Sequence, residues 1–187
     1  GVEADDLIAA YSKKLSEEGH EVLIISADKD LAQLVSDKVR QMLPPPTANP
    51  RIGWRELDPT AVEEKFGVKP SQIADYLALI GDTSDNIPGL RGVGPKTAAK
   101  WLVQYGSLEE IIAHCGELNP KRFQGLVYAE ADNVRLNLQM TLLDQTLQVD
   151  VAAHAEPQIE RAIEILREME MGKTADALEK RLSNQDS

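Results

Sequence analysis

The first apolar pattern along the chain is helical, and it carries acidic residues on its opposite side. On a helical wheel the acids are Glu3, Asp5 and Asp6, and the apolar side holds Ala4, Leu7, Ile8, Tyr11 and Leu15. Acids in a first turn stabilise a helix through its dipole. Three carboxylates within four residues also repel each other unless a cation lies among them. This segment alone therefore leaves two interpretations open, a stabilised helix start and a cation site.

A short apolar run rich in β-branched residues follows at residues 21–26 and predicts a buried parallel strand. Asp28 and Asp30 come after its carboxyl end, and a further helical pattern begins at Leu31. In open α/β sheets, ligands bind outside the carboxyl ends of the strands, so these acids are expected of a metal or phosphate site. The alternative is that Asp28 simply caps a helix.

Pro44, Pro45, Pro46 and Pro50 exclude a long helix in residues 39–66, and the stretch predicts an edge strand and a loop. Asp58 and Pro59 indicate a capped helix start, and Gly67 ends that helix. Trp54 and Trp101 are interpreted as core residues, the more common role, in preference to base-stacking residues.

The most distinctive stretch is residues 81–100, GDTSDNIPGLRGVGPKTAAK, which lies between two predicted helices. Ile73, Tyr76, Leu77 and Ile80 recur at helical spacing before it. Within it, Gly92 and Gly94 can take a positive φ and turn the backbone sharply, and Pro95 suits the first position of the following helix.

This helix, glycine-rich hairpin and helix together favour phosphate binding. The free amides and positive dipole end at a helix start attract phosphate without reading bases. Arg91, Lys96 and Lys100 add positive charge to the same edge. The alternative is a tight connection between two helices with no ligand.

The remaining pattern is helical, apart from one extended segment. Ser107 is expected to cap a helix that Gly116 closes, and a long helix is predicted over residues 121–138. Residues 141–151 are expected to be extended. A single terminal helix is predicted over residues 157–182, packed back on the body of the protein and followed by a frayed end.

The composition is that of an ordinary globular protein, because 42% of the 187 residues are hydrophobic. No apolar run approaches membrane-spanning length. Cys115 is the only cysteine, which excludes an internal disulfide, and no cluster of His or Cys suggests zinc. The formal net charge of −11 does not exclude nucleic acid, because binding depends on where the positive residues lie.

Three acidic motifs, GVEADD, SADKDL and GDTSDNIPGLRGVG, occur in the order and approximate spacing of the structure-specific 5′ nuclease (flap endonuclease) family. That family includes the 5′-3′ exonuclease domain of bacterial DNA polymerase I and stand-alone bacterial 5′ nucleases. The resemblance extends through EKFGVKPSQIADYLALIGD and YGSLEEII and covers roughly residues 1 to 150.

The resemblance implies an α/β fold in which a partial parallel sheet with flanking helices (PIN/resolvase-like) precedes a helical helix-hairpin-helix domain. The domains implied are 1–68, 69–150 and a carboxyl-terminal segment, 151–187. The metal-binding acids implied are Glu3, Asp5, Asp6, Asp28, Asp30, Asp82 and Asp85, of which Asp28, Asp30, Asp82 and Asp85 are also the catalytic set. Two Mg²⁺ or Mn²⁺ ions would suit them, since hard divalent cations prefer carboxylate oxygens.

In the hairpin, the resemblance implies DNA contacts from Arg91, Gly92, Val93, Gly94, Lys96, Thr97 and Lys100, and a K⁺ ion in the turn. The expected activity is divalent-metal-dependent 5′-3′ exonuclease or 5′-flap endonuclease cleavage in DNA replication and repair. The alternative is a non-catalytic module that grips duplex DNA through the hairpin; the retained acids favour the enzyme.

The expected partner is branched or duplex DNA with a 5′ end, bound by a monomer in the bacterial cytoplasm with no membrane involved. Family members carry a further amino-terminal half, with more metal-binding aspartates and a basic arch. The present chain begins at Gly1 without Met, inside a motif. We therefore expect it to be weakly active or inactive alone, and its full-length parent to be active.

Overall fold

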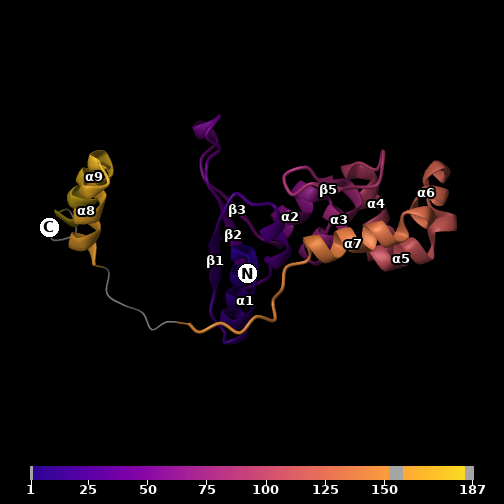
Figure 1. Ribbon diagram of the computed structural model, residues 1–187, viewed down its shortest axis with the longest axis horizontal. Helices are drawn as coiled ribbons and strands as arrows, with labels where there is room; N and C mark the ends of the chain where they lie inside the picture. The colour runs from indigo at the N-terminus through magenta and orange to yellow at the C-terminus, as the bar shows by residue number, and fades with distance from the viewer. Residues whose placement is uncertain (1, 152–157, 184–187) are drawn as a thin grey trace. The chain divides into compact units, whose positions relative to one another are not determined.

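The computed structural model describes residues 2–151 and 158–183, and the chain divides into two compact units, Gly1–Val149 and Asp150–Ser187. Figure 1 shows the elements of both units along the chain. Among the described residues, no helix is both long and apolar enough to span a membrane.

A three-stranded sheet lies in the amino-terminal part of the first unit (Figure 1). Its order is β1-β2-β3, with β1 parallel to β2 and β3 antiparallel to β2, and the strands are Val22–Ile25, Val39–Leu43 and Arg55–Leu57. The prediction of an edge strand in residues 39–66 holds for β3 but is wrong for β2, which is central. The prolines do not prevent this, because the first of them, Pro44, comes directly after the last residue of β2.

Strand β1 is parallel as predicted but is buried on one face only. Ile24 is buried, whereas Leu23 and Ile25 are 52% and 64% exposed. The described sheet ends at β1, so one edge of this strand has no neighbour within the described residues. The prediction of a fully buried strand is therefore wrong.

Helix α1 (Ala4–Glu17) forms where the pattern predicts it, but only part of the predicted apolar stripe is covered, with Ile8 packed against a core cluster. Its buried residues are Ala9, Ala10 and Ser12, while Leu7 and Tyr11 of the apolar stripe are exposed. Small side chains let the helix approach the sheet closely, and Ala9 packs in a core cluster with Ile24, Leu31, Leu34 and Val39.

Helix α2 (Pro59–Phe66) confirms its predicted boundaries. The Asp58 carboxylate accepts a hydrogen bond from the Ala61 amide at 2.7 Å, and Gly67 ends the helix with φ of 75°.

The two tryptophans differ. Trp101 is fully buried, as predicted, and its indole N–H donates to the Asn119 carbonyl at 2.9 Å. Trp54 lies just before β3 and is 59% exposed, so its assignment to the core is wrong.

The helix–hairpin–helix arrangement is confirmed, with a small two-stranded sheet inside it that the pattern did not predict. Its elements are α3 (Ile73–Ile80), β4 (Gly81–Asp82), β5 (Ile87–Pro88) and α4 (Pro95–Tyr105). Gly92 has the expected positive φ of 80°, but Gly94 has φ of −107° and forms the N-cap of α4. Only one of the two glycines is therefore needed for the sharp turn.

Beyond the hairpin, Ser107 caps α5 (Leu108–Ala113) through the Glu110 amide, as predicted. The single helix predicted over residues 121–138 is instead two, α6 (Gln124–Ala129) and α7 (Ala131–Thr141), which meet at a break at Glu130. The short 3-10 helices of this unit are η1 (Asp30–Leu34), η2 (Pro50–Ile52), η3 (Pro70–Gln72), η4 (Cys115–Glu117) and η5 (Lys121–Phe123).

Helix α7 packs alongside α3 (Figure 1). Two buried polar side chains anchor it. Asn137 donates to the carbonyls of Ala78 and Pro88, at 3.1 and 2.5 Å, and the Thr141 hydroxyl donates to the Ala74 carbonyl. These bonds attach α7 to both α3 and the strand that follows the acidic loop.

The described residues of the second unit form two helices, α8 (Ile159–Glu168) and α9 (Gly172–Ser183), where one was predicted. The chain turns between them at Glu170, whose φ is 59°, and Arg167 pairs with Glu179 at 2.8 Å. Residues 152–157 and 184–187, which include the predicted frayed end, lie outside the described residues. The predicted packing of this unit against the body stays a prediction.

Candidate metal centre

Asp82 is the last residue of β4, and Asp85 lies in the loop that joins β4 and β5. Helix α3 ends at Gly81, whose φ of 81° directs the chain into β4, and Asp82 faces Ile87 across the two-stranded sheet. Asn86 closes the loop with φ of 56°, a conformation that Asn adopts more readily than most residues. The loop is therefore fixed at both ends before any ligand binds.

Asp30 is positioned by the turn at the carboxyl end of β1. The Asp28 carboxylate accepts a hydrogen bond from the Asp30 amide at 3.0 Å, and η1 starts at Asp30. Gln41, fully buried on β2, donates its amide group to the carbonyls of Ser26 and Asp28 at 3.0 and 2.5 Å. The central strand thus holds the turn that carries two of the predicted acids.

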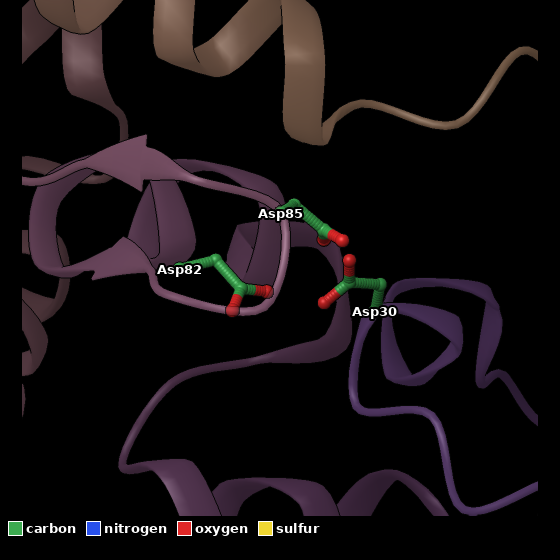
Figure 2. A group of neighbouring side chains, drawn as sticks. All are labelled: Asp30, Asp82 and Asp85. Atoms are coloured by element: carbon green, nitrogen blue, oxygen red, sulfur yellow. The ribbon is translucent and has the colours of Figure 1, made fainter.

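These two segments bring three carboxylates together. Asp30, Asp82 and Asp85 each offer an oxygen atom, and the three atoms lie within 4.8 Å of one another. Figure 2 shows the three side chains directed toward a common space, Asp30 from the turn after β1, Asp82 from the end of β4 and Asp85 from the β4–β5 loop. Such a set of oxygen atoms suits a hard divalent cation.

The electrostatics of the cluster indicate a missing positive charge. Burial raises the pKa of Asp30 to about 6, although the Lys29 ammonium acts in the opposite direction. Its Oδ1 atom is buried and has no hydrogen-bond partner. A buried carboxylate oxygen without a partner costs free energy, and a bound cation would remove that cost. The residues present therefore fit a metal ion.

Asp82 has the opposite electrostatic character. Burial acts to raise its pKa, but hydrogen bonds from Lys29 and from the hydroxyl and amide of Ser84 outweigh it and lower the pKa to about 2. Asp82 therefore stays ionised over the whole physiological range.

The other predicted acids line a cavity of about 590 Å³ beside the cluster of Asp30, Asp82 and Asp85. Its acidic lining residues are Glu3, Asp5, Asp6, Asp28, Asp30, Asp85 and Asp144. Asp82 is not among them and contacts Lys29 instead. Burial and then the charges of Asp28 and its other acidic neighbours raise the pKa of Asp5. One Asp6 oxygen accepts a hydrogen bond from the Asp144 amide at 2.9 Å, so Asp6 also attaches the segment after α7 to α1.

Lys29, Gln41 and Asp144 were not singled out from the sequence. Lys29 lies between the two acids of SADKDL, and this position is the feature of the sequence that could have indicated its contact with the acids. Gln41 is a weaker indication, because it is a polar residue in an otherwise mostly apolar strand. Nothing in the local pattern around Asp144 distinguishes it from other acids in extended segments.

The predicted DNA-binding residues lie in the turn before α4 and in the first turns of that helix. Arg91, Gly92, Lys96 and Lys100 are exposed, whereas Val93 is buried in the core. The Val93 amide donates to the Leu90 carbonyl at 2.9 Å, which closes the turn. The buried Val93 side chain anchors the turn while the glycine and the cationic side chains around it stay accessible.

Comparison with known proteins shows the family to which this chain belongs. The family model for the 5′-3′ exonuclease N-terminal resolvase-like domain matches residues 1–67, and that for the 5′-3′ exonuclease C-terminal SAM fold matches residues 68–164. The chain belongs to the 5′-3′ exonuclease family. These matches confirm both the resemblance stated from the motifs and the predicted fold class.

Curated relatives of this 5′-3′ exonuclease family chain include DNA polymerases. DNA polymerase I of Thermus thermophilus is 38% identical over 174 residues, which are 92% of this chain and 20% of the polymerase. DNA polymerase I of Mycobacterium tuberculosis is 49% identical over 115 residues, which are 60% of this chain and 12% of the polymerase.

Solved structures of phage nucleases share the fold. T5 5′-exonuclease with bound divalent metal ions (zinc) matches with a TM-score of 0.65 and 29% identity, over 77% of this chain and 51% of the T5 chain. A bacteriophage T5 flap endonuclease in a pseudo-enzyme–product complex with DNA and metal ions matches with a TM-score of 0.64 and 28% identity, over 78% and 50%. The chain thus spans about half the length of these nucleases and about a fifth of the Thermus polymerase.

Proposed function

We propose that this chain provides the metal centre and the DNA-binding hairpin of a divalent-metal-dependent 5′-3′ exonuclease and flap endonuclease. The observation that carries the proposal is the convergence of Asp30, Asp82 and Asp85, with a buried Asp30 oxygen that has no hydrogen-bond partner. Family membership and the metal-bound T5 structures support the same conclusion.

We propose Asp30, Asp82 and Asp85 as ligands of one cation, and the acids of the adjacent cavity, Glu3, Asp5, Asp6 and Asp28, as candidates for a second. Two Mg²⁺ or Mn²⁺ ions bound there would activate water and stabilise both oxygens of an in-line phosphoryl displacement. The chain's own contribution is to hold the carboxylates in register, through the Asp28 turn, Gln41 and the β4–β5 loop.

The hairpin would bind the phosphate backbone of duplex DNA next to a 5′ end or branch. Backbone amides around Gly92 and Gly94, together with the side chains of Lys96, Thr97 and Lys100, are suited to phosphate contacts without base specificity. Carbonyl groups of Val93 and its neighbours would hold a K⁺ ion in the turn. Arg91, exposed in the same turn, would add a further cation.

The proposal extends to the setting in which the chain acts. Branched DNA with a free 5′ end would be its substrate, the chain would act as a monomer, and the bacterial cytoplasm is where such DNA is found. The bacterial polymerase relatives are consistent with this setting.

The direct test is cleavage of a labelled 5′-flap DNA by the 187-residue chain with Mg²⁺ or Mn²⁺. We expect slow, metal-dependent release of 5′ products, since the chain spans about half the length of the T5 nucleases. Asp82→Asn should reduce the rate on the order of a hundredfold. Asp37→Asn, which changes an exposed acid away from the cluster, should leave the rate unchanged.

Three results would count against the proposal. Cleavage that persists in Asp82→Asn, or without divalent metal, would place the activity elsewhere. Salt-sensitive DNA binding without divalent-metal binding at Asp82 would identify the chain as a binding module only.

A further inference from the structure

A single cationic side chain lies among the acids of the metal centre. Two cavities adjoin Asp85: the large one described above, and one of about 280 Å³ lined by Ala27, Asp28, Lys29, Ser84 and Asp85. Of all the described residues that line these two cavities, Lys29 alone is basic.

The Lys29 ammonium contacts the proposed ligands directly. It donates a hydrogen bond to Asp82 Oδ2, lies 3.4 Å from the Ser84 hydroxyl, and lies 3.6 Å from Asp30 Oδ1. The last distance is too long for a hydrogen bond, so the buried Asp30 oxygen stays without a partner. Lys29 therefore neutralises part of the cluster and leaves the rest unsatisfied.

We propose that Lys29 is a tethered counter-ion, which holds the carboxylates together in the metal-free protein and leaves Asp82 when a divalent cation binds. This inference rests on the proposed metal site. A divalent ion bound at Asp82 would repel the Lys29 ammonium that contacts the same carboxylate. In this exchange the negative charge of the carboxylates is offset by the Lys29 ammonium in the metal-free protein and by the divalent cation once metal is bound.

The structure provides the freedom that such an exchange needs. The Lys29 side chain is 37% exposed, and four flexible methylene groups separate its ammonium from the backbone. The adjoining 280 Å³ cavity, with Asp28, Ser84 and Asp85 in its lining, can receive the displaced ammonium. The backbone at Lys29 need not move, because the Asp28 and Gln41 bonds hold the turn.

Displacement of Lys29 by metal and a purely structural role of Lys29 predict different effects of replacing this lysine. Because the metal must displace the ammonium, Lys29 weakens metal binding although it stabilises the metal-free fold. Removing its charge should therefore have opposite effects on the two properties. A lysine that merely supports the fold would, when replaced, weaken both.

The test is Mn²⁺ binding, followed by the electron paramagnetic resonance signal of free Mn²⁺, with wild type, Lys29→Met and Lys29→Arg. Competition between ligands for shared groups typically changes affinity by about fivefold or more. We expect Lys29→Met to bind Mn²⁺ at least about fivefold more tightly, and Lys29→Arg to remain near wild type. Lys38→Met is the matched control, because it removes one exposed lysine whose ammonium contacts the Ser16 carbonyl. Its Mn²⁺ affinity should be unchanged.

Thermal unfolding gives the second readout. In EDTA, Lys29→Met should melt below wild type, and saturating Mn²⁺ should close the difference. If Lys29→Met does not fold, Lys29→Gln replaces it, since its amide can still donate to Asp82 without a charge; the same tightening is expected.

Two outcomes would overturn the inference, and they are distinguishable. If wild type binds Mn²⁺ through Asp82 but the uncharged Lys29 variants bind it equally or more weakly, the exchange is wrong and the metal site stands. If wild type and Asp82→Asn bind Mn²⁺ alike, the proposed metal site is wrong, and the exchange is wrong with it.

Discussion

The backbones of Gly81 and Gly89 approach so closely that neither position has room for a side chain. A Cβ atom on Gly81 would lie 2.3 Å from the Gly89 amide nitrogen, and one on Gly89 would lie 2.2 Å from the Ile80 carbonyl oxygen. The contact joins the end of α3 to the chain just after β5. It closes the base of the loop that carries Asp82 and Asp85.

Gly89→Ala should therefore destabilise the protein by about 2 kcal/mol or more, because a backbone that cannot yield must move. The φ of Gly89 is not in the left-handed region, so the effect is steric. Urea denaturation measures it. Gly125→Ala in α6 is the control, since a Cβ there meets nothing within 4 Å and alanine should be neutral or stabilising. Equal stability of the two variants would contradict the close contact.

The pKa of Asp30, raised to about 6, predicts a pH dependence of metal binding. The unfolded carboxyl group ionises near pH 4 and the folded one near pH 6. Asp30 therefore favours the metal-free fold below about pH 4, and this contribution is lost as the pH rises to about 6. Above pH 6 the ionised carboxylate is free to bind metal. We expect the rise in melting temperature caused by Mg²⁺ to grow between pH 5 and pH 7.

Melting curves in EDTA and in Mg²⁺ at pH 5, 6 and 7 check this expectation. Asp30→Asn, which cannot ionise, should abolish the pH dependence in that window. The low pKa of Asp82, about 2, places its titration well below the range measured. A metal effect that is the same at pH 5 and pH 7 would contradict the assignment of Asp30.

The hairpin predicts a salt-dependent contact with DNA. Replacing both Lys96 and Lys100 by alanine should weaken duplex binding for every sequence and reduce the slope of log affinity against log salt by about 2. Fluorescence anisotropy at several salt concentrations measures both quantities. The paired control is Lys13→Ala with Lys38→Ala, which removes two exposed lysines near α1 and β2. If the two pairs weaken binding equally, the hairpin is not the contact surface.

Features of the fold that depend on a few neighbouring residues were predictable from the sequence. Asp58 caps α2, Ser107 caps α5 and Pro95 begins α4, because each satisfies or removes free amides at a helix start. The motifs also include Asp30, Asp82 and Asp85, the three acids that the structure brings together.

Features that depend on packing between distant segments were not predictable. Helix α1 buries Ala9, because the space beside Ile24 and Leu31 suits a small side chain. Its hydrophobic stripe gives no sign of that space. Trp54 is large and apolar, yet it is exposed because no described segment covers it.

In the candidate metal centre, too, some features follow from neighbouring residues and others depend on packing between distant segments. The identity of the acids follows from their motifs, but the proximity of Asp30 to Asp82 depends on how α3 and β4 pack against the turn after β1. The contact of Lys29 with Asp82 follows from that packing too. No pattern of neighbouring residues encodes either distance.

Cleavage of the backbone by bound Fe²⁺ can show whether the turn after β1 and the β4–β5 segment form one divalent-metal centre. Fe²⁺ accepts carboxylate ligands and, with ascorbate and peroxide, generates radicals that cut the nearby backbone. We predict cuts near residues 28–30 and 82–85 together, suppressed by excess Mg²⁺ and absent from Asp82→Asn. Cuts at only one of these segments, or cuts that persist in Asp82→Asn, would contradict a shared metal centre.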